Sequence, residues 1–304
     1  MNLKNEPILR IDTVYINYHS YKDLTNSIKS LYEVFKNSGI KNNIYIVDNS
    51  YNEVPKKIIR KIKSFCNNYK NNNFQTIYLP SKKNIGFGAA VNLALLKSKS
   101  PLILLINCDT DLGSLSLEAL IKLIKKVNDK IVIAGPRIID EYGFDQESVF
   151  SFDPISILLK PVRHIKKIGK ISKILAKNPY INKYLEKINY QNQKINKPCY
   201  VDWISGCFML IDRKFLDICG GFDNRYFLYF EDVDICRTAR KFGKSVLYDP
   251  NLKIMHRGNY ESAKKKGILN SILFNKVSRY HISSWLKYLW KWKSDFLFKS
   301  IPSL

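Results

Sequence analysis

The chain has 304 residues, and a hydrophobic content of 45% excludes a globally disordered protein. Fifty basic against 26 acidic residues give a net charge of +24, which indicates an anionic partner or surface. No apolar run approaches the length of about 20 residues that a membrane span needs, and the residues after Met1 lack the apolar stretch of a secretory signal. We therefore expect a cytoplasmic protein. Its six cysteines form no C-x-x-C pair and no zinc-like grouping, so we expect reduced, mostly buried thiols.

Most of the excess charge lies in two segments. Residues 151–200 hold 11 basic and 2 acidic residues, and residues 257–304 hold 10 and 2. Apolar residues recur among these lysines, as they do in basic amphipathic helices that lie on anionic membranes. The alternative is that both segments pack on the domain or on another subunit. The charge alone also suggests a nucleic-acid-binding protein, but the chain has no recognised motif of that class.

The first half of the chain alternates between strand and helix patterns. Apolar and β-branched runs predict strands at residues 13–18, 44–47, 76–79 and 102–106. Helical spacing predicts helices over about 22–36, after residue 55, and over about 84–97. Such alternation with short connections is typical of βαβ units, so we expect an α/β fold with a Rossmann-like, mostly parallel central sheet flanked by helices.

An acidic tip follows the most apolar of these strands, residues 102–106. It carries Asp109 and Asp111. In open α/β sheets ligands bind at the carboxyl ends of strands, and carboxylates there suit Mg²⁺ or Mn²⁺ carrying a phosphate. The alternative for Asp111 is that it caps a helix that starts near Leu115.

A glycine-rich turn, Gly86-x-Gly88, opens the third predicted helix. A helix start of this kind supplies backbone N–H groups to a phosphate. The turn nearly matches the dinucleotide fingerprint of NAD(P)-dependent oxidoreductases, which makes that class an alternative. The match is poor, because a bulky Val91 stands where the fingerprint needs a small residue.

The second half begins with a predicted strand and turn at residues 131–136, followed by the basic insertion at about 151–198. Sheet-like sequence resumes at residues 200–211 and again at 245–248. Between them, Glu231, Asp232 and Asp234 fall in the first turn of a predicted helix, where the helix dipole favours acids. Three acids so close together predict a raised pKa for one of them.

Six short motifs follow one another in a fixed order. They are Val47-Asp48-Asn49-Ser50, Asn84-x-Gly86-Phe87-Gly88-x-x-x-Asn92, Asn107-Cys108-Asp109, Trp203-x-Ser205-Gly206, Gly220-Gly221-Phe222-Asp223 and Phe230-Glu231-Asp232-Val233-Asp234. With these motifs the chain resembles family 2 glycosyltransferases with the GT-A fold, and among them bacterial rhamnosyltransferases of surface polysaccharide synthesis. The resemblance covers residues from about 12 to 258. Cys108 departs from the Asn-Pro-Asp of that branch, and Asn107 departs from the Asp-x-Asp of GT-A enzymes.

The resemblance implies that residues 1–112 form the nucleotide-sugar-binding half. Asp48 would accept a hydrogen bond from the imide of uracil or thymine, or else serve as a turn acid. The remaining contacts to the nucleotide sugar would come from Asn49, Asn84, Gly86, Gly88, Asn92 and Asn107. Asp109 would bind Mg²⁺ or Mn²⁺, with Asp111 and His256 as further ligands. The alternative for His256 is a structural histidine.

The resemblance further implies that residues 113–258 form the acceptor-binding and catalytic half. Asp232 would be the catalytic base, since a sugar hydroxyl attacks only as its proton is accepted. Glu231 is the competing base, and the acids alternatively serve only as favourable first-turn charges. Trp203 and Gly206 would contact the acceptor, unless Trp203 is a buried core residue.

The expected reaction is inverting transfer of a sugar from a nucleotide diphosphate to an acceptor hydroxyl. The resemblance favours L-rhamnose from dTDP-rhamnose and a polyprenyl-diphosphate-linked acceptor of an O-antigen or capsule. UDP-galactose, UDP-glucose and UDP-N-acetylglucosamine are alternative donors, and a GT-A-like nucleotidyltransferase is an alternative enzyme. We expect residues 259–304 to form basic amphipathic helices that hold the enzyme on the inner face of the cell membrane. A homodimer is a further expectation, and nucleic acid is not an expected partner.

Overall fold

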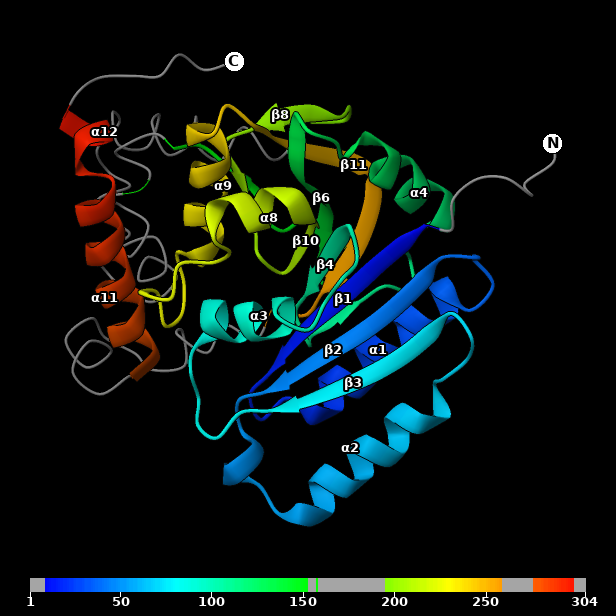
Figure 1. The fold of residues 1–304 in the computed structure, drawn as a ribbon. Helices are drawn as coiled ribbons and strands as arrows, with labels where there is room; N and C mark the ends of the chain where they lie inside the picture. Colours follow the sequence, from blue (N-terminus) through cyan, green and yellow to red (C-terminus); the bar gives the residue numbers. More distant parts are fainter. Residues whose placement is uncertain (1–8, 153–156, 158–194, 259–275, 298–304) are drawn as a thin grey trace.

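The computed structural model describes residues 9–152, 157, 195–258 and 276–297 (Figure 1). Most of the predicted basic insertion at 151–198 lies outside the described residues, and so do 259–275 and 298–304 of the predicted tail.

A mixed central sheet organises the fold. Among the described residues it has nine strands, in the order β3-β2-β1-β4-β10-β6-β11-β5, with β8 paired to β11. Their bounds are β1 Arg10–Asn17, β2 Lys41–Asp48, β3 Phe74–Pro80, β4 Leu102–Ile106, β5 Thr110–Asp111, β6 Ile131–Ile139, β8 Cys199–Val201, β10 Phe208–Asp212 and β11 Ser245–His256. A separate two-stranded sheet pairs β7 (Val149–Phe150) with β9 (Trp203–Ile204).

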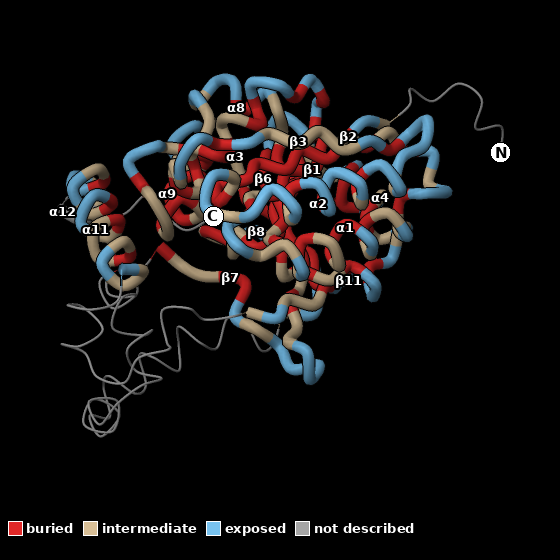
Figure 2. The backbone as a smooth tube through the Cα atoms, turned by 90° about the horizontal axis from the view of Figure 1, so that it is seen from below, coloured by how far each residue is buried: buried red, intermediate tan, exposed pale blue. Residues whose placement is uncertain are grey.

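Helices cover both faces of the sheet, and the strands therefore alternate between two apolar clusters (Figures 1 and 2). One face packs on α1 (Tyr21–Phe35), α2 (Lys56–Asn68) and α4 (Leu117–Lys126). The other packs on α3 (Phe87–Leu95), α8 (Arg213–Cys219) and α9 (Glu231–Lys241). Helix α11 (Lys276–Lys291) lies beyond α9, on its side away from the sheet, and adds Tyr288 to the same cluster (Figure 1). In β1, Ile11 and Tyr15 belong to the first cluster and Val14 to the second, as the period of two in a strand requires. Two short helices, η2 (Tyr51–Glu53) and α12 (Lys293–Leu297), complete the described elements.

The predicted parallel half is present as β3-β2-β1-β4. Strand β10 is antiparallel to both β4 and β6, and this direction matters for the site. Its first residue, Phe208, lies opposite Ile106, the last residue of β4. The segment that precedes β10 therefore reaches the same sheet edge as the acidic tip that follows β4.

The predicted short strand at 245–248 is longer than expected. It continues through a register irregularity between Asp249 and Lys253 to His256, as the single strand β11. This continuation carries His256 to the edge where β5 pairs with β11.

The C-terminal helix α11 is packed into the domain and does not form a separate tail. Tyr288 is fully buried and Trp292, which directly follows α11, is 5% exposed, and both belong to the apolar cluster that contains α9. Asp234 of α9 accepts hydrogen bonds from Trp292 Nε1 at 2.7 Å and Lys291 Nζ at 2.7 Å. None of the described helices combines the length and apolar character needed to cross a bilayer.

The cysteines match their prediction, because all six are free and four of them are buried. Burial raises the pKa of Cys66 to about 11 and that of Cys207 to about 12, so both stay protonated near neutral pH.

Candidate active site

The segment Ser205-Gly206-Cys207 links two of the predicted sites. The backbone N–H of Asn107 donates to the Cys207 carbonyl at 2.9 Å. The backbone N–H of Gly206 donates to Asp232 Oδ2 at 3.2 Å. Through two consecutive residues, the acidic tip after β4 and the start of α9 are therefore held at one edge of the sheet.

Asp109 and His256 come into direct contact at this edge. His256 Nε2 lies 3.1 Å from Asp109 Oδ1, with the two side chains 16% and 21% exposed. The pairing of β5 with β11 places His256 opposite Thr110, and the N–H of Arg257 donates to the Asp109 carbonyl at 3.1 Å. Cys108 stands between the two polar positions of its motif but is buried, with its thiol donating to the Ile16 carbonyl.

This pair fits a divalent cation only in part. The carboxylate oxygen of this pair suits both Mn²⁺ and Mg²⁺, whereas the imidazole nitrogen suits a transition metal better than the oxygen-preferring Mg²⁺. Within the described part of the chain, no three His, Cys, Asp or Glu side chains converge on one point. Asp111 Oδ1 accepts the Gly113 N–H at 2.8 Å, while Ser116 caps α4, so Asp111 is a turn residue and not the helix cap. Among the described residues this contact supplies two candidate ligands, and phosphate oxygens and water would complete the shell, as is usual for Mg²⁺. A role of Asp111 as a further ligand stays a prediction.

The glycine-rich turn is built by contacts that reach across the chain. Gly86 has a φ of +86°, and a Cβ at this position would lie 2.5 Å from the Phe227 carbonyl. Asn84 Oδ1 accepts the Gly86 N–H at 3.0 Å, and Asn49 Nδ2 donates to the Gly86 carbonyl at 3.1 Å. A Cβ at Gly88 would lie 3.9 Å from Glu231 Cβ, so the turn adjoins the start of α9.

Asn92 holds a loop, and its role as a nucleotide contact stays a prediction. Its amide donates to the Phe222 carbonyl at 2.7 Å and to Asn224 Oδ1 at 2.8 Å, and it accepts the Phe222 N–H at 2.8 Å. A Cβ at Gly221 would lie 2.5 Å from Asn92 Oδ1. The amide of Asn92 is thus committed to the Gly221–Asn224 loop.

Asp48 is fully buried at the end of β2. Its Oδ1 accepts hydrogen bonds from Asn17 Nδ2 and from the N–H and hydroxyl of Ser50, and its Oδ2 accepts from the hydroxyls of Tyr21 and Tyr78. Burial, followed by the bond to Asp48, raises the pKa of Tyr78, so this hydroxyl stays a donor. Recognition of a base by Asp48 stays a prediction, with the added condition that a tyrosine hydroxyl must move aside.

Asp232 and Glu231, both in the first turn of α9, differ in their contacts. Asp232 Oδ1 accepts the Val233 N–H at 2.8 Å, and its Oδ2 faces Gly206. Glu231 is 8% exposed, next to Gly88. Burial raises the pKa of Asp234, which agrees with the prediction that one of the three acids has a raised pKa; the cause is burial and not like charge within the turn.

Strained backbone leads into this turn. Tyr229 and Phe230 have φ values of 69° and 71°, a left-handed conformation that costs about 1–3 kcal/mol at a non-glycine residue. Helix α11 stabilises this segment, since Ser284 Oγ donates to the Leu228 carbonyl at 2.9 Å and the Phe230 ring packs 5.2 Å from that of Tyr288.

The burial of Trp203 favours the predicted alternative of a core residue over the role in acceptor binding. Trp203 is 4% exposed, and its ring stacks on Phe150 with centroids 3.9 Å apart. Its Nε1 donates to the Ser151 carbonyl at 3.3 Å. The ring therefore has no open face on which a sugar could stack.

The sequence motifs do not indicate three residues that contribute to this region. Tyr21 and Tyr78 bond Asp48, and Gln146 bonds His256. The positions of Tyr78 near the end of a strand and of Tyr21 at the start of a helix give only a weak indication that they lie at a site. Gln146 had none, because its partner is 110 residues away.

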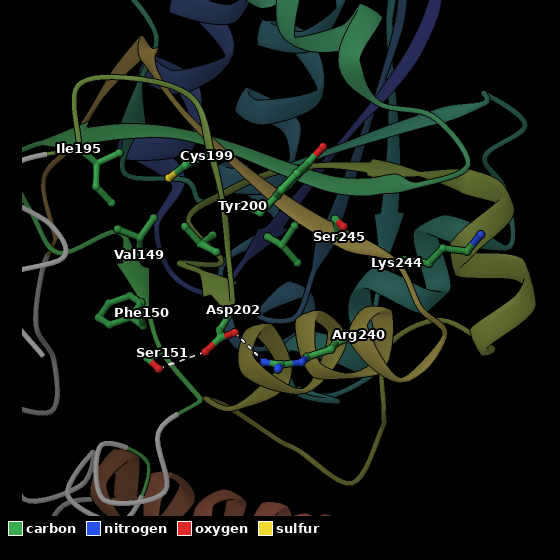
Figure 3. A pocket seen from close by; sticks show the side chains of 12 residues that line it. Val149, Phe150, Ser151, Ile195, Cys199, Tyr200, Asp202, Arg240, Lys244 and Ser245 are labelled. Carbon is green, nitrogen blue, oxygen red and sulfur yellow. Dashed lines mark hydrogen bonds and ion pairs between the residues drawn. The ribbon is translucent and has the colours of Figure 1, made fainter. Parts of the chain in front are cut away.

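A cavity of about 250 Å³ lies away from this edge, between the ends of α9, β7, β8 and β11 (Figure 3). Its polar groups pair with one another: Asp202 accepts from Arg240 at 2.7 Å and from the Ser151 hydroxyl at 3.1 Å. Arg240 lies eight residues beyond Asp232 in α9, about 12 Å along the helix axis. The cavity is therefore separate from the candidate active site.

Known proteins with similar sequences belong to the class that the motifs predict, the glycosyltransferases. The family model for glycosyl transferase family 2 matches residues 13–218. The rhamnosyltransferase WbbL of Escherichia coli (strain K12) is 31% identical over 105 residues, which are 34% of this chain and 37% of WbbL. An N-acetylglucosaminyl-diphospho-decaprenol L-rhamnosyltransferase of Mycobacterium tuberculosis (strain CDC 1551 / Oshkosh) is 26% identical over 198 residues, which are 61% of this chain and 60% of that protein. The chain thus aligns with less than two thirds of the length of either relative.

Solved structures agree in fold. GalNAc-T7 with UDP, GalNAc and Mn²⁺ superposes with a TM-score of 0.54 at 14% identity, covering 83% of this chain and 44% of GalNAc-T7. The mannosyltransferase PcManGT from Pyrobaculum calidifontis, in complex with GDP-Man and Mn²⁺, gives 0.52 at 10% identity, covering 98% and 77%. At these identities the likeness shows the GT-A fold alone. Together with the family match over more than half of the chain, it establishes that this protein belongs to glycosyltransferase family 2, has the GT-A fold and is similar in sequence to rhamnosyltransferases.

Proposed function

We propose that this enzyme transfers a sugar, with inversion, from a nucleotide diphosphate to a hydroxyl of a lipid-linked surface polysaccharide. The observation that carries the proposal is the Gly206-Cys207 link, which holds Asp232 at the edge where Asp109 and His256 meet. A base beside a phosphate-binding edge is what direct displacement at an anomeric carbon needs.

In the proposed reaction the acceptor hydroxyl attacks the anomeric carbon as Asp232 accepts its proton. The bond between that carbon and the diphosphate oxygen breaks, and the nucleoside diphosphate leaves with the electron pair. Asp109 and His256 would hold a divalent cation, which when bound supplies charge neutralisation of the leaving diphosphate. Two N–H groups at the Gly86 turn are already paired, that of Gly86 with Asn84 Oδ1 and that of Phe87 with the Phe227 carbonyl. A phosphate at the start of α3 would therefore be bound by the N–H groups that follow, those of Gly88 and Ala89.

The first candidate donor is dTDP-rhamnose, because the two curated relatives are named as rhamnosyltransferases. The test incubates the purified chain with dTDP-rhamnose, UDP-galactose, UDP-glucose or UDP-N-acetylglucosamine, and measures nucleoside diphosphate release with Mg²⁺, Mn²⁺ or EDTA. We expect release from dTDP-rhamnose with a divalent cation. Release that is undiminished in EDTA contradicts metal dependence. Release from a UDP-sugar alone would identify that UDP-sugar as the donor in place of dTDP-rhamnose. The anomeric configuration of the product, read by NMR, tests inversion.

Membrane association is a second part of the proposal. Helix α11 exposes Leu286 (54%) and Trp290 (67%) on one side, and Lys293 Nζ lies 5.7 Å from the centre of the Trp290 ring. Exposed apolar residues beside lysines favour an anionic lipid surface. We expect flotation with anionic vesicles, and weaker flotation of a Leu286→Ser, Trp290→Ser variant. Equal flotation of the two proteins would remove α11 from the membrane-binding surface.

A further inference from the structure

Gln146 contacts His256 at two places. Its Nε2 donates to the His256 main-chain carbonyl at 2.6 Å, and its Oε1 lies 3.1 Å from His256 Nδ1. The first contact ties Gln146 to the end of β11, and the second ties it to the imidazole ring. Ring and backbone of His256 are thus held by one side chain.

These contacts determine which ring nitrogen carries the proton. A carbonyl oxygen only accepts hydrogen bonds, so the amide group next to it must be the NH₂ group. The amide oxygen therefore faces Nδ1, and since it too only accepts, Nδ1 must carry a hydrogen. Nε2 lies 3.1 Å from Asp109 Oδ1, so both ring nitrogens face oxygens that accept. With Nδ1 held as the donor by Gln146, Nε2 is the nitrogen that would offer its lone pair to a divalent cation bound beside Asp109.

A hydrogen-bonded turn, residues 140–145, precedes Gln146 and holds its backbone in position. Asp140 Oδ1 accepts the backbone N–H groups of Tyr142 and Phe144, and the Arg137 guanidinium bonds both oxygens of Asp145. The Gln146 N–H then donates to the Ile138 carbonyl at 2.9 Å. The backbone on both sides of the turn is therefore held in place, and the Gln146 side chain extends from it to His256.

We propose that Gln146 is a positioning residue that holds His256 with Nε2 toward Asp109, so that the two side chains form a ready divalent-cation site. Metal-binding histidines commonly donate their second ring N–H to an acceptor that fixes their orientation. A freely rotating ring would present either nitrogen, and cation binding would have to order it. The inference rests on the metal-binding part of the proposed function.

The test measures Mn²⁺ binding to the purified full chain by electron paramagnetic resonance of free Mn²⁺, without any turnover. Gln146→Leu removes both contacts, and we expect it to weaken Mn²⁺ binding by about 10- to 100-fold. Gln146→Asn shortens the amide so that it cannot make both contacts, and it provides the same test should the leucine variant fail to fold. The matched control is Gln75→Leu on β3, whose amide donates to Asn43 Oδ1 at 2.8 Å and whose loss should leave the affinity unchanged.

A double-mutant cycle separates positioning from a merely structural effect. In a His256→Ala background, Gln146→Leu should cause no further loss, because the ring that it positions is gone. An equal loss in both backgrounds overturns the proposal, as does unchanged affinity in the Gln146→Leu and Gln146→Asn proteins. Nitrogen NMR of the imidazole gives a second readout: the Mg²⁺-loaded wild type should show its ring proton on Nδ1, and Gln146→Leu should lose this preference.

Failure of the metal site itself has a different outcome. Asp109→Ala and His256→Ala should each weaken Mn²⁺ binding. If both bind Mn²⁺ like the wild type, the metal-binding part of the proposed function is wrong. If both lose binding and the Gln146 variants keep it, only the positioning role is wrong.

Discussion

Gly206 donates its backbone N–H to Asp232 Oδ2 at 3.2 Å, and a Cβ at Gly206 would lie only 3.1 Å from Asp232 Cβ. Only glycine allows this approach without displacing the neighbour. Gly206 was predicted as an acceptor contact from its motif, and its observed contact is with the candidate base. The contact gives a physical reason for a glycine at this position of the motif.

Asp232→Asn should lower the rate of nucleoside diphosphate release by about 10²- to 10⁴-fold, because an amide cannot accept the acceptor's proton. The measurement is kcat with the donor identified above, together with circular dichroism to confirm folding. Asp217→Asn, which changes an exposed carboxylate on α8, is the matched control and should keep full activity. Full activity of Asp232→Asn would assign the base elsewhere, with Glu231 as the next candidate.

Gly206→Ala should lower kcat by up to about 10²-fold, since a displacement of the base by a few tenths of an ångström to 1 Å disturbs its alignment. The donor KM should change little, because the contacts of Gly206 described above are with the candidate base and not with the proposed donor-binding turn at Gly86. A rise in KM at constant kcat would instead support the original prediction of a substrate contact at Gly206.

Gly86→Ala and Gly39→Ala compare a glycine that has a close neighbour and a backbone conformation almost restricted to glycine (φ 86°, ψ 175°) with a glycine in open space. Both residues have positive φ values, +86° and +72°. A Cβ at Gly86 would lie 2.5 Å from the Phe227 carbonyl, whereas nothing lies within 4 Å at Gly39. We expect Gly39→Ala to lower the free energy of unfolding by about 1–2 kcal/mol with normal nucleotide binding. Gly86→Ala should lower stability by more and should also weaken UDP or dTDP binding, measured by calorimetry. Equal losses in the two variants would show that neither the close approach to Phe227 nor the backbone conformation of Gly86 adds to the cost.

Much of the fold was accessible from the sequence because its signals are local. The apolar run at 102–106, the helical spacing at 22–36 and the β-branched runs around them follow from burial on a two-sided sheet, and the structure has these elements within a few residues. The order of the motifs identified the family. These signals depend on neighbours along the chain, which a sequence displays directly.

The roles of the site residues were harder to predict from the sequence, because their side chains bond to or pack against residues that are distant along the chain. Asn92 has the residue type and motif position of a ligand contact, but a loop 130 residues away occupies its amide. Trp203 has the residue type of a sugar platform, but Phe150 covers its ring. Gln146 has no sequence signal at all. Whether a polar or aromatic side chain faces a ligand depends on tertiary packing, which residue type and spacing do not specify.

The packing of α11 makes a direct prediction for stability. Tyr288 is fully buried and accepts a hydrogen bond from Arg237 at 2.8 Å, whereas Trp290 on the same helix is 67% exposed. Tyr288→Ala should lower the free energy of unfolding by about 3–5 kcal/mol, and Trp290→Ala by less than about 0.5 kcal/mol. Urea unfolding followed by circular dichroism measures both. Similar small effects would mean that α11 is attached to the surface and does not form part of the core.

Asp223 gives the protein a specific dependence on pH. Burial acts to raise the pKa of this carboxyl, but hydrogen bonds from Arg225 and Lys291 outweigh it and hold the pKa well below its usual 3.8. A lowered folded-state pKa adds stability that is present above pH 3.8 and is lost as the pH falls toward the folded-state value. Asp223→Asn should therefore be less stable than the wild type by about 2 kcal/mol at pH 6, and the difference should shrink steadily below pH 3.8. Urea unfolding at a series of pH values measures this difference, and Asp217→Asn, which removes an exposed ion pair with Arg213, should change stability by less than about 0.5 kcal/mol throughout. A difference that stays constant down to the lowest pH would show that Asp223 acts through packing and not through its charge.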